Sequence, residues 1–202
     1  GEVAATGGTS GVVYAMTNSL SVKESSRVNN FAHVNYKKGN EPRIGKLLCI
    51  NGAGIQYRWL LNNLSVASYE EMNNLASEIP VGSDGVCMIP FGNGAERMLN
   101  SKDIGTRLVN IKLNNHGKGH ICRAALEGIA FSFVYGMEIM KSDGIEVNVM
   151  RAGNDNLFRS EIFSNTVATL IGHEIEIYNT TGAIGAARAS VLHEGDFETF
   201  GK

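Results

Sequence analysis

The first part of the chain alternates hydrophobic and polar positions in a way that predicts strands. Residues 3–6 and 11–17 read as two strands around a glycine-rich turn, because the second is rich in β-branched and aromatic residues. Residues 31–36 alternate more loosely and predict a third strand. Residues 47–50 are either a short buried strand or the entry to a helix. The chain is therefore expected to open with a hairpin inside a sheet.

Helical spacing of apolar residues dominates the rest of the chain. The strongest helix is predicted over residues 118–141, where apolar side chains recur every three or four positions and Gly144 follows as a stop. Further helices are predicted over 55–63, from Ser68 to Pro80, from Asn156 as the cap to residue 171, and over 183–193. Strands are predicted at 85–90, 147–152 and 174–178, whereas 92–115 carries no clear pattern. This order predicts an α/β domain with a mixed sheet and helices on both faces.

Composition narrows the classes of partner. The chain has 202 residues, which fits one domain, and its formal net charge of −2 gives no reason to expect nucleic acid. A polybasic run and an apolar segment of membrane-spanning length are both missing from the sequence, so no membrane partner is expected. Cys49, Cys87 and Cys122 show no pairing pattern; they are expected to be buried thiols in a reduced, cytoplasmic protein.

A glycine-rich turn at residues 7–11 is the first candidate for chemistry. Glycine on both sides of a hairpin can bring backbone N–H groups against an anion, and the hydroxyls of Thr9 and Ser10 would add donors beside Gly8. The alternative interpretation is a plain hairpin turn.

Two further glycine-centred turns are candidates. Gly54 stands at a helix entry, where small residues leave space beside the free N–H groups of the first turn, and Arg58 follows four residues later. Gly153, Asn154 and Asn156 lie between a strand and a helix, where ligands of open α/β sheets bind. The alternatives are a tight strand-to-helix turn at the first, and at the second a helix that Asn156 merely caps. A fourth turn, at 180–183, opens a helix of small residues that is expected to pack closely against a neighbour.

Other common chemistries find little support. The sequence has no Lys-Ser/Thr phosphate loop, and Ser10 lies in no Gly-x-Ser-x-Gly elbow. The histidines show no metal-ligand spacing. Glu127 lies within an apolar helix, where a buried carboxylate needs a hydrogen-bonding partner, so a structural role is expected for it.

Six segments in order resemble the C-terminal domain of the FGGY carbohydrate kinases, and among them the xylulokinases. The most specific is 123–131, Arg-Ala-Ala-Leu-Glu-Gly-Ile-Ala-Phe, which is similar to the family's Arg-Ala-x-x-Glu-Gly-x-Ala-Phe helix. The others are the Gly-Thr-Ser turn at 7–14, the glycine helix entry at 52–60, a segment at 89–97 that resembles the family's Pro-Tyr-x-x-Gly-Glu-Arg, the adenosine loop at 152–158 and the Gly-Ala-x-Gly-Ala-Ala helix at 181–187.

The resemblance implies an actin-like ATPase fold of the ribonuclease H type, a mixed sheet flanked by helices. Residues 1–202 would be the C-terminal nucleotide-binding domain of a two-domain sugar kinase whose N-terminal domain is absent. By the same resemblance, Thr9 with Gly8 and Ser10 would hold the terminal phosphates of ATP. Gly54 and Arg58 would line the nucleotide pocket.

The adenosine loop departs from the family pattern. Gly153, Asn154 and Asn156 would contact the adenosine and the α-phosphate, but the usual Gly-Gly-Gly-Ala loop is here Ala-Gly-Asn-Asp at 152–155. The usual Gly-Glu-Arg-Thr-Pro is Ala-Glu-Arg-Met-Leu at 95–99. These differences indicate a divergent branch.

The resemblance also implies an ATP-dependent phosphotransferase that uses Mg²⁺. The catalytic base and metal ligands are expected upstream of Gly1, so no catalytic residue or metal ligand is assigned within this chain, which is expected to be inactive alone. Its partners would be ATP, a pentulose such as D-xylulose, and the N-terminal domain; a homodimer is left open. The alternatives are a related kinase for glycerol, gluconate or another sugar, and a non-catalytic actin-like nucleotide-binding module.

Overall fold

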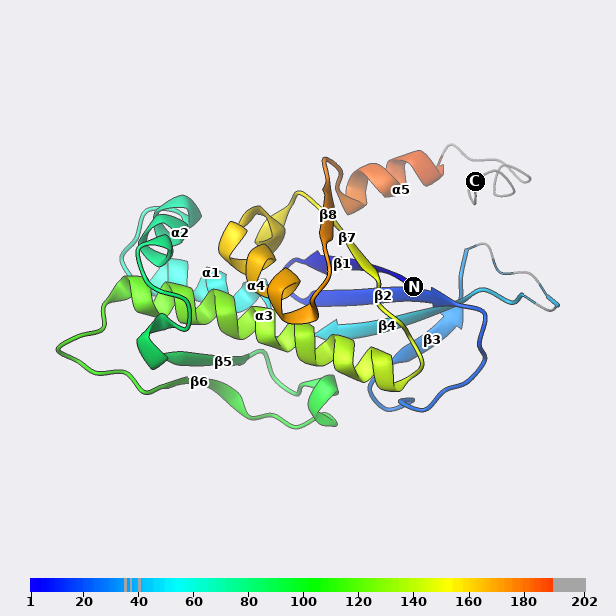
Figure 1. Cartoon of the computed structure of the whole chain (residues 1–202), viewed down its shortest axis with the longest axis horizontal. Coiled ribbons are helices and arrows are strands. Elements are labelled where there is room, and N and C mark those ends of the chain that lie inside the picture. Colours follow the sequence, from blue (N-terminus) through cyan, green and yellow to red (C-terminus); the bar gives the residue numbers. More distant parts are fainter. Residues whose placement is uncertain (35, 37, 40, 191–202) are drawn as a thin grey trace.

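A six-stranded mixed sheet forms the centre of the molecule (Figure 1). The computed structural model describes residues 1–190 apart from positions 35, 37 and 40. The strands lie in the order β3-β4-β2-β1-β7-β8, in which β1 is antiparallel to β2 and parallel to β7. Their bounds are β1 (Glu2–Gly7), β2 (Gly11–Thr17), β3 (Asn29–Ala32), β4 (Ile44–Ile50), β7 (Val149–Gly153) and β8 (Ile175–Tyr178). The predicted mixed sheet is confirmed.

Strand β3 is shorter and earlier than the predicted strand at 31–36. It pairs with β4 only from Asn29 opposite Leu47 to Ala32 opposite Ile44. The ladder stops where β4 begins, two residues after Pro42, which has no N–H to donate. The stretch expected at 47–50 as a strand or a helix entry is the second half of β4.

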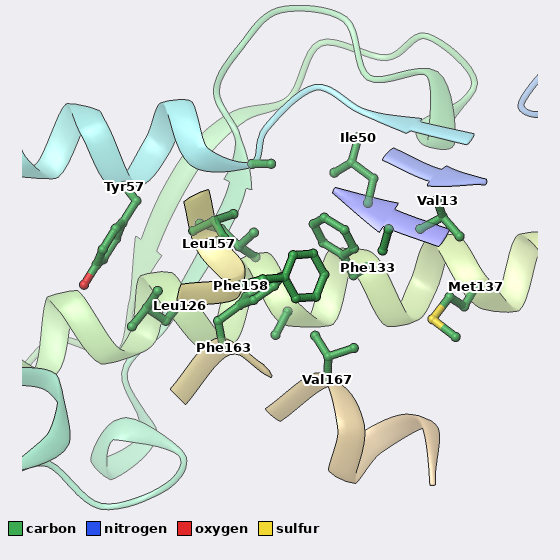
Figure 2. Close-up of a cluster of buried hydrophobic side chains, with 14 of the residues drawn as sticks. Val13, Ile50, Tyr57, Leu126, Phe133, Met137, Leu157, Phe158, Phe163 and Val167 are labelled. Carbon is green, nitrogen blue, oxygen red and sulfur yellow. The ribbon is translucent and has the colours of Figure 1, made fainter. Parts of the chain in front are cut away.

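Among the described elements, the long helix α3 (Lys118–Ser142) supplies the largest share of the buried hydrophobic core. Figure 2 shows Phe133 of α3 meeting Phe158 and Phe163, below Val13 of β2 and Ile50 of β4. The three rings pack edge to face with centroids 5.2 to 6.2 Å apart. Such pairs add about 0.5–1.5 kcal/mol each beyond the burial of their area. The ring cluster therefore fixes the chain after β7 against the helix and the sheet.

The segment after β7 differs from its prediction. Asn156 does not cap a long helix; it starts the short 3-10 helix η3 (Asn156–Arg159) with a positive φ of 47°. The helix α4 (Glu161–Ile171) begins only after Ser160. Because the chain bends at Ser160, helical spacing counted from residue 157 fails farther on, and Leu170 is 49% exposed rather than inward.

The remaining elements lie between β4 and α3 or after β8. They are α1 (Gly54–Asn63), α2 (Tyr69–Ser77), η1 (Ser83–Gly85), β5 (Cys87–Phe91), η2 (Arg97–Leu99), β6 (Gly105–Val109) and α5 (Gly182–Ser190). β5 and β6 pair as a separate two-stranded sheet. Figure 1 shows this hairpin running beside α3, with which β5 is in contact.

The two faces of the main sheet are covered differently. Helices α3 and α4 pack together over the face that holds the buried residues of β1 and β2. On the other face, the alternate residues Glu2, Ala4 and Thr6 of β1 are exposed. The close packing expected of the last helix is absent from the described residues, because all nine residues of α5 are exposed. Over the described range, no helix combines the length and apolarity that crossing a bilayer requires.

Two expectations about individual buried groups have opposite outcomes. Glu127 has the structural partners expected of it, since Oε1 accepts from Arg123 Nε at 2.8 Å and from Gly82 N at 3.0 Å. The cysteines are not uniformly buried: Cys122 is buried, Cys49 is half-buried and Cys87 is exposed. Burial raises the pKa of the Cys122 thiol to about 11.

Candidate functional site

Four strands end at one edge of the main sheet. β2 is antiparallel to both β1 and β4, so β1 and β4 run in the same direction. β7 is parallel to β1 and β8 is parallel to β7, so all four strands share this direction. Figure 1 shows the arrows of β1 and β4 pointing to the end of the sheet where α1 begins. Loops that follow carboxyl ends of strands form the usual ligand edge of an α/β sheet. The three candidate turns therefore share one edge.

The first turn forms the tip of the β1–β2 hairpin. Gly7 pairs with Gly11, which leaves Gly8, Thr9 and Ser10 as the tip, with Thr9 exposed. Within the described part of the chain, the N–H groups of Thr9 and Ser10 have no hydrogen-bond acceptor. Free N–H groups beside two hydroxyls suit an anion.

The carbonyl groups of this turn are held by helix α1. Gly54 N donates to Gly8 O at 2.9 Å, and Ile55 N donates to Thr9 O at 3.0 Å. The expectation that these first-turn N–H groups are free is therefore wrong: they bind the hairpin tip instead of a ligand. A Cβ on residue 54 would lie 2.4 Å from Gly8 O, so glycine is needed there for the two backbones to approach.

Arg58 lies one helical turn beyond Gly54, on the same side of α1, and is exposed. The contact of Gly54 with Gly8 places the start of α1 at the hairpin tip, and Arg58 follows one turn later. The role of its guanidinium in a nucleotide pocket stays a prediction.

The third loop follows β7. The β1–β7 register pairs Ala5 with Ala152, which places Gly153 beside the last residues of β1. Asn154 N donates to Tyr178 O at 2.8 Å, so the backbone of the loop is tied to β8. The side chains of Asn154 and Asn156 are exposed, and Asn156 is not used as a helix cap.

The first and third loops are in direct contact. A Cβ on Gly7 would lie 2.8 Å from Leu157 Cβ, so η3 packs onto the end of β1. All eight predicted residues therefore lie around one sheet edge, which is open to solvent. A groove of about 450 Å³ between β5 and α3 is a separate feature of the surface.

Sequence reasoning missed one residue near this edge. Glu96 is fully buried, and its carboxylate accepts a hydrogen bond from Asn51 N at the end of β4. Its only signal in the sequence was its place in segment 89–97, which carries a resemblance but no periodicity.

Comparison with known proteins decides the family. A family model described as the C-terminal domain of the FGGY family of carbohydrate kinases matches residues 3–192. The chain belongs to this family. FGGY kinases have an actin-like ATPase fold, and the mixed sheet flanked by helices described above is that fold, as the sequence predicts.

Several FGGY relatives are similar along most of the chain. The xylulose kinase of Haemophilus influenzae is 25% identical over 193 residues, which cover 95% of this chain and 37% of the relative. The gluconokinase of Bacillus licheniformis is 23% identical over 99% of this chain and 40% of its own length. A solved xylulose kinase from Brucella ovis superposes with a TM-score of 0.80 at 22% identity, over 93% of this chain and 38% of that structure. This FGGY chain thus spans about two fifths of the length of these relatives.

Proposed function

We propose that the chain is the nucleotide-binding half of an ATP-dependent carbohydrate kinase. The observation that carries the proposal is the meeting of three loops of this FGGY domain at one sheet edge, one of which holds the free N–H groups of Thr9 and Ser10. The proposal includes a cytoplasmic location, because the phosphate donor is ATP.

The loops would divide the nucleotide between them. Phosphoryl transfer depends on positioning and charge stabilisation rather than on covalent chemistry by the protein. The N–H groups and hydroxyls of Thr9 and Ser10, beside Gly8, would receive the terminal phosphates. Gly54 and Arg58 would line the pocket next to them.

The loop after β7 would bind the other end of the nucleotide. Gly153 lets this loop lie against Thr180, because a Cβ there would be 2.5 Å from Thr180 O. The exposed amides of Asn154 and Asn156 would supply donors and acceptors for adenosine and the α-phosphate, next to Gly153. Because Asn154 is tied to β8 and Leu157 to β1, this loop is held at a fixed place relative to the hairpin tip.

The rest of the reaction would come from an upstream N-terminal domain. The described residues contain no group of three or more His, Cys, Asp or Glu that could hold a metal, so the proposal assigns Mg²⁺ no ligand among them. Mg²⁺ would neutralise phosphate charge when ATP is bound. The base for the sugar hydroxyl and the sugar pocket would also lie upstream, in line with the two-fifths coverage of the relatives.

D-xylulose is the proposed substrate of the whole enzyme. Xylulose kinases recur among the similar proteins, from Haemophilus influenzae, Escherichia coli and Bacillus subtilis. Gluconate and glycerol are the alternatives, because a gluconokinase and a glycerol kinase also match. Phosphorylation assays of the whole enzyme with the three substrates decide between them, and the 202-residue chain alone should phosphorylate none.

Calorimetric titration of the chain with ADP tests the nucleotide site. Thr9→Val keeps the shape of the side chain but removes its hydroxyl, which should weaken ADP binding about tenfold, the effect of one hydrogen bond to a charged group. Thr17→Val, at the other end of β2, is the matched control and should leave ADP affinity unchanged. Absence of ADP binding by the folded chain, or equal weakening by both variants, would contradict the proposal.

A further inference from the structure

Glu96 carries a buried carboxylate in the segment that joins β5 to η2. The residue is 0% exposed, and within the described part of the chain its carboxylate forms no ion pair. A buried charge of this kind is tolerated only where hydrogen bonds replace its lost water. The groups that donate hydrogen bonds to the Glu96 carboxylate therefore indicate its structural role.

Both carboxylate oxygens accept from backbone N–H groups. Oε2 accepts from Asn51 N at 2.8 Å, and Oε1 accepts from Met98 N at 3.3 Å. A carboxylate offers acceptors on both oxygens, whereas a side-chain amide has one acceptor oxygen and an NH₂ group that only donates. Glutamine at this position would have to point its NH₂ group at one of the two N–H donors.

Asn51 is held from three sides by the same segment. Besides the bond to Glu96, its Nδ2 donates to Ala95 O at 2.7 Å, and Asn93 Nδ2 donates to Asn51 O at 3.1 Å. The next residue is enclosed as well, because a Cβ on Gly52 would lie 1.7 Å from Pro90 O. The exit of β4 is thus fixed in place by residues 90–96.

This fixed exit leads directly into the contact with the hairpin tip. Two and three residues after Gly52, Gly54 N and Ile55 N donate to the carbonyl oxygens of Gly8 and Thr9. The order of contacts is therefore carboxylate, β4 exit, first turn of α1 and hairpin tip. Each step is a covalent link or a hydrogen bond with a backbone N–H donor, so a shift at Glu96 should be passed on to the tip.

We infer that Glu96 is a positioning residue that sets the phosphate-binding turn by fixing the β4 exit at Asn51. This rests on the proposed nucleotide site. Glu96 does not contact the nucleotide; it keeps the N–H groups of Thr9 and Ser10 at the place where phosphate oxygens bind. Its loss should therefore weaken binding of the phosphates and spare binding of adenosine.

The experiment compares ADP with adenosine in two variants of the chain. Glu96→Gln should weaken ADP binding about tenfold and adenosine binding by less than twofold. Glu127→Gln is the matched control, because Glu127 is a similarly buried carboxylate that accepts from a backbone N–H, yet it lies on α3 beside Gly82. The control should leave the ratio of the two affinities unchanged.

A purely structural role would give a different result. If Glu96→Gln weakens ADP and adenosine equally, or if Glu127→Gln changes the ratio as much, the inference is wrong. Asn93→Ala removes only the bond to Asn51 O and keeps the test usable should Glu96→Gln not fold. It should change the ratio in the same direction by a smaller factor, and an unchanged ratio would count against the inference.

Amide hydrogen exchange separates this inference from the proposed function. Glu96→Gln should speed exchange at Gly54 and Ile55, and Glu127→Gln should not. If the wild-type chain binds no nucleotide but this difference appears, the nucleotide site is wrong and the positioning by Glu96 stands. Unchanged exchange at both residues in Glu96→Gln overturns the inference whatever the chain binds.

Discussion

Gly54 lets two loops come into contact because it has no Cβ to meet the carbonyl oxygen of Gly8. The sequence indicates glycine turns at both positions, and the structure confirms that they meet. The sequence could not show that the N–H groups of one turn bind the carbonyl oxygens of the other. Free N–H groups at a helix start are a ligand site only if no other carbonyl reaches them, and here Gly8 and Thr9 supply those carbonyls.

Gly54→Ala should separate these loops. The new Cβ would lie 2.4 Å from Gly8 O, a backbone atom that cannot move aside without shifting the hairpin tip. We expect a loss of about 1–3 kcal/mol in the free energy of unfolding, the usual cost of overpacking, together with weaker ADP binding. Urea denaturation measures the first and calorimetry the second.

Gly185→Ala is the control for this substitution. Gly185 also lies in a helix, but nothing stands within 4 Å of its Cβ position. Alanine there should leave stability unchanged or raise it by up to about 1 kcal/mol, the difference in helix propensity. A Gly54→Ala protein as stable as this control would show that the hairpin tip moves freely.

At the scale of elements, a buried ion pair fastens a loop to the end of α3. Lys46 of β4 pairs with Asp143, and its Nζ also donates to Ser21 O at 2.8 Å. Asp143 Oδ1 in turn accepts from the N–H groups of Lys23 and Glu24, at 2.6 and 3.0 Å. The pair therefore joins β4, the end of α3 and the loop after β2.

The stability of this junction should depend on acid pH. Burial would raise the pKa of Asp143, but the hydrogen bond from Lys46 and those from two backbone N–H groups outweigh it and lower the pKa. A lowered folded pKa means that the stabilisation is complete above the unfolded value of about 3.9 and is lost as the pH falls below it.

Asp143→Asn tests this dependence. Removing one partner of a buried pair costs about 3–5 kcal/mol, so the variant should be less stable by roughly that amount at pH 7. The difference from the wild type should shrink as the pH falls below about 4, because the wild-type carboxylate then also loses its charge. Urea denaturation across this range measures it, and a constant difference would argue against an ionised Asp143.

Some elements could be predicted closely and others could not, for physical reasons. α2 has the Ser68 cap that the sequence indicates, with Ser68 Oγ accepting from Glu71 N at 3.1 Å. The start of α4 was missed because helical spacing does not reveal a bend between two short helices. β6 was missed because four of its five residues are exposed, which leaves no hydrophobic alternation to read.

For the whole molecule, the order of the elements was enough to predict the mixed sheet and the shared edge. Strands joined by hairpins must alternate in direction, and those joined through helices tend to be parallel. The candidate site follows from this, because parallel strands end together. The order of elements does not reveal contacts between loops, and Glu96 was missed for that reason.

Local stability should differ sharply between the central helix α3 and the last described helix, α5. Every residue from Cys122 to Ala130 in α3 is buried, whereas every residue of α5 is exposed. Hydrogen exchange of the chain should therefore be slowest in that part of α3 and fastest in α5. Slow exchange throughout α5 would show that this helix is covered by a neighbouring surface.

The pairing of β1 with β7 has a consequence for how the molecule is assembled. Glu2 lies opposite Val149, so one edge of β1 pairs with a strand that follows almost 150 residues later in the chain. Pairings so distant in sequence form slowly, and until then β1 presents an unpaired backbone edge to other chains. A growing or shortened chain that stops before Val149 would therefore be expected to associate with its own copies through β1.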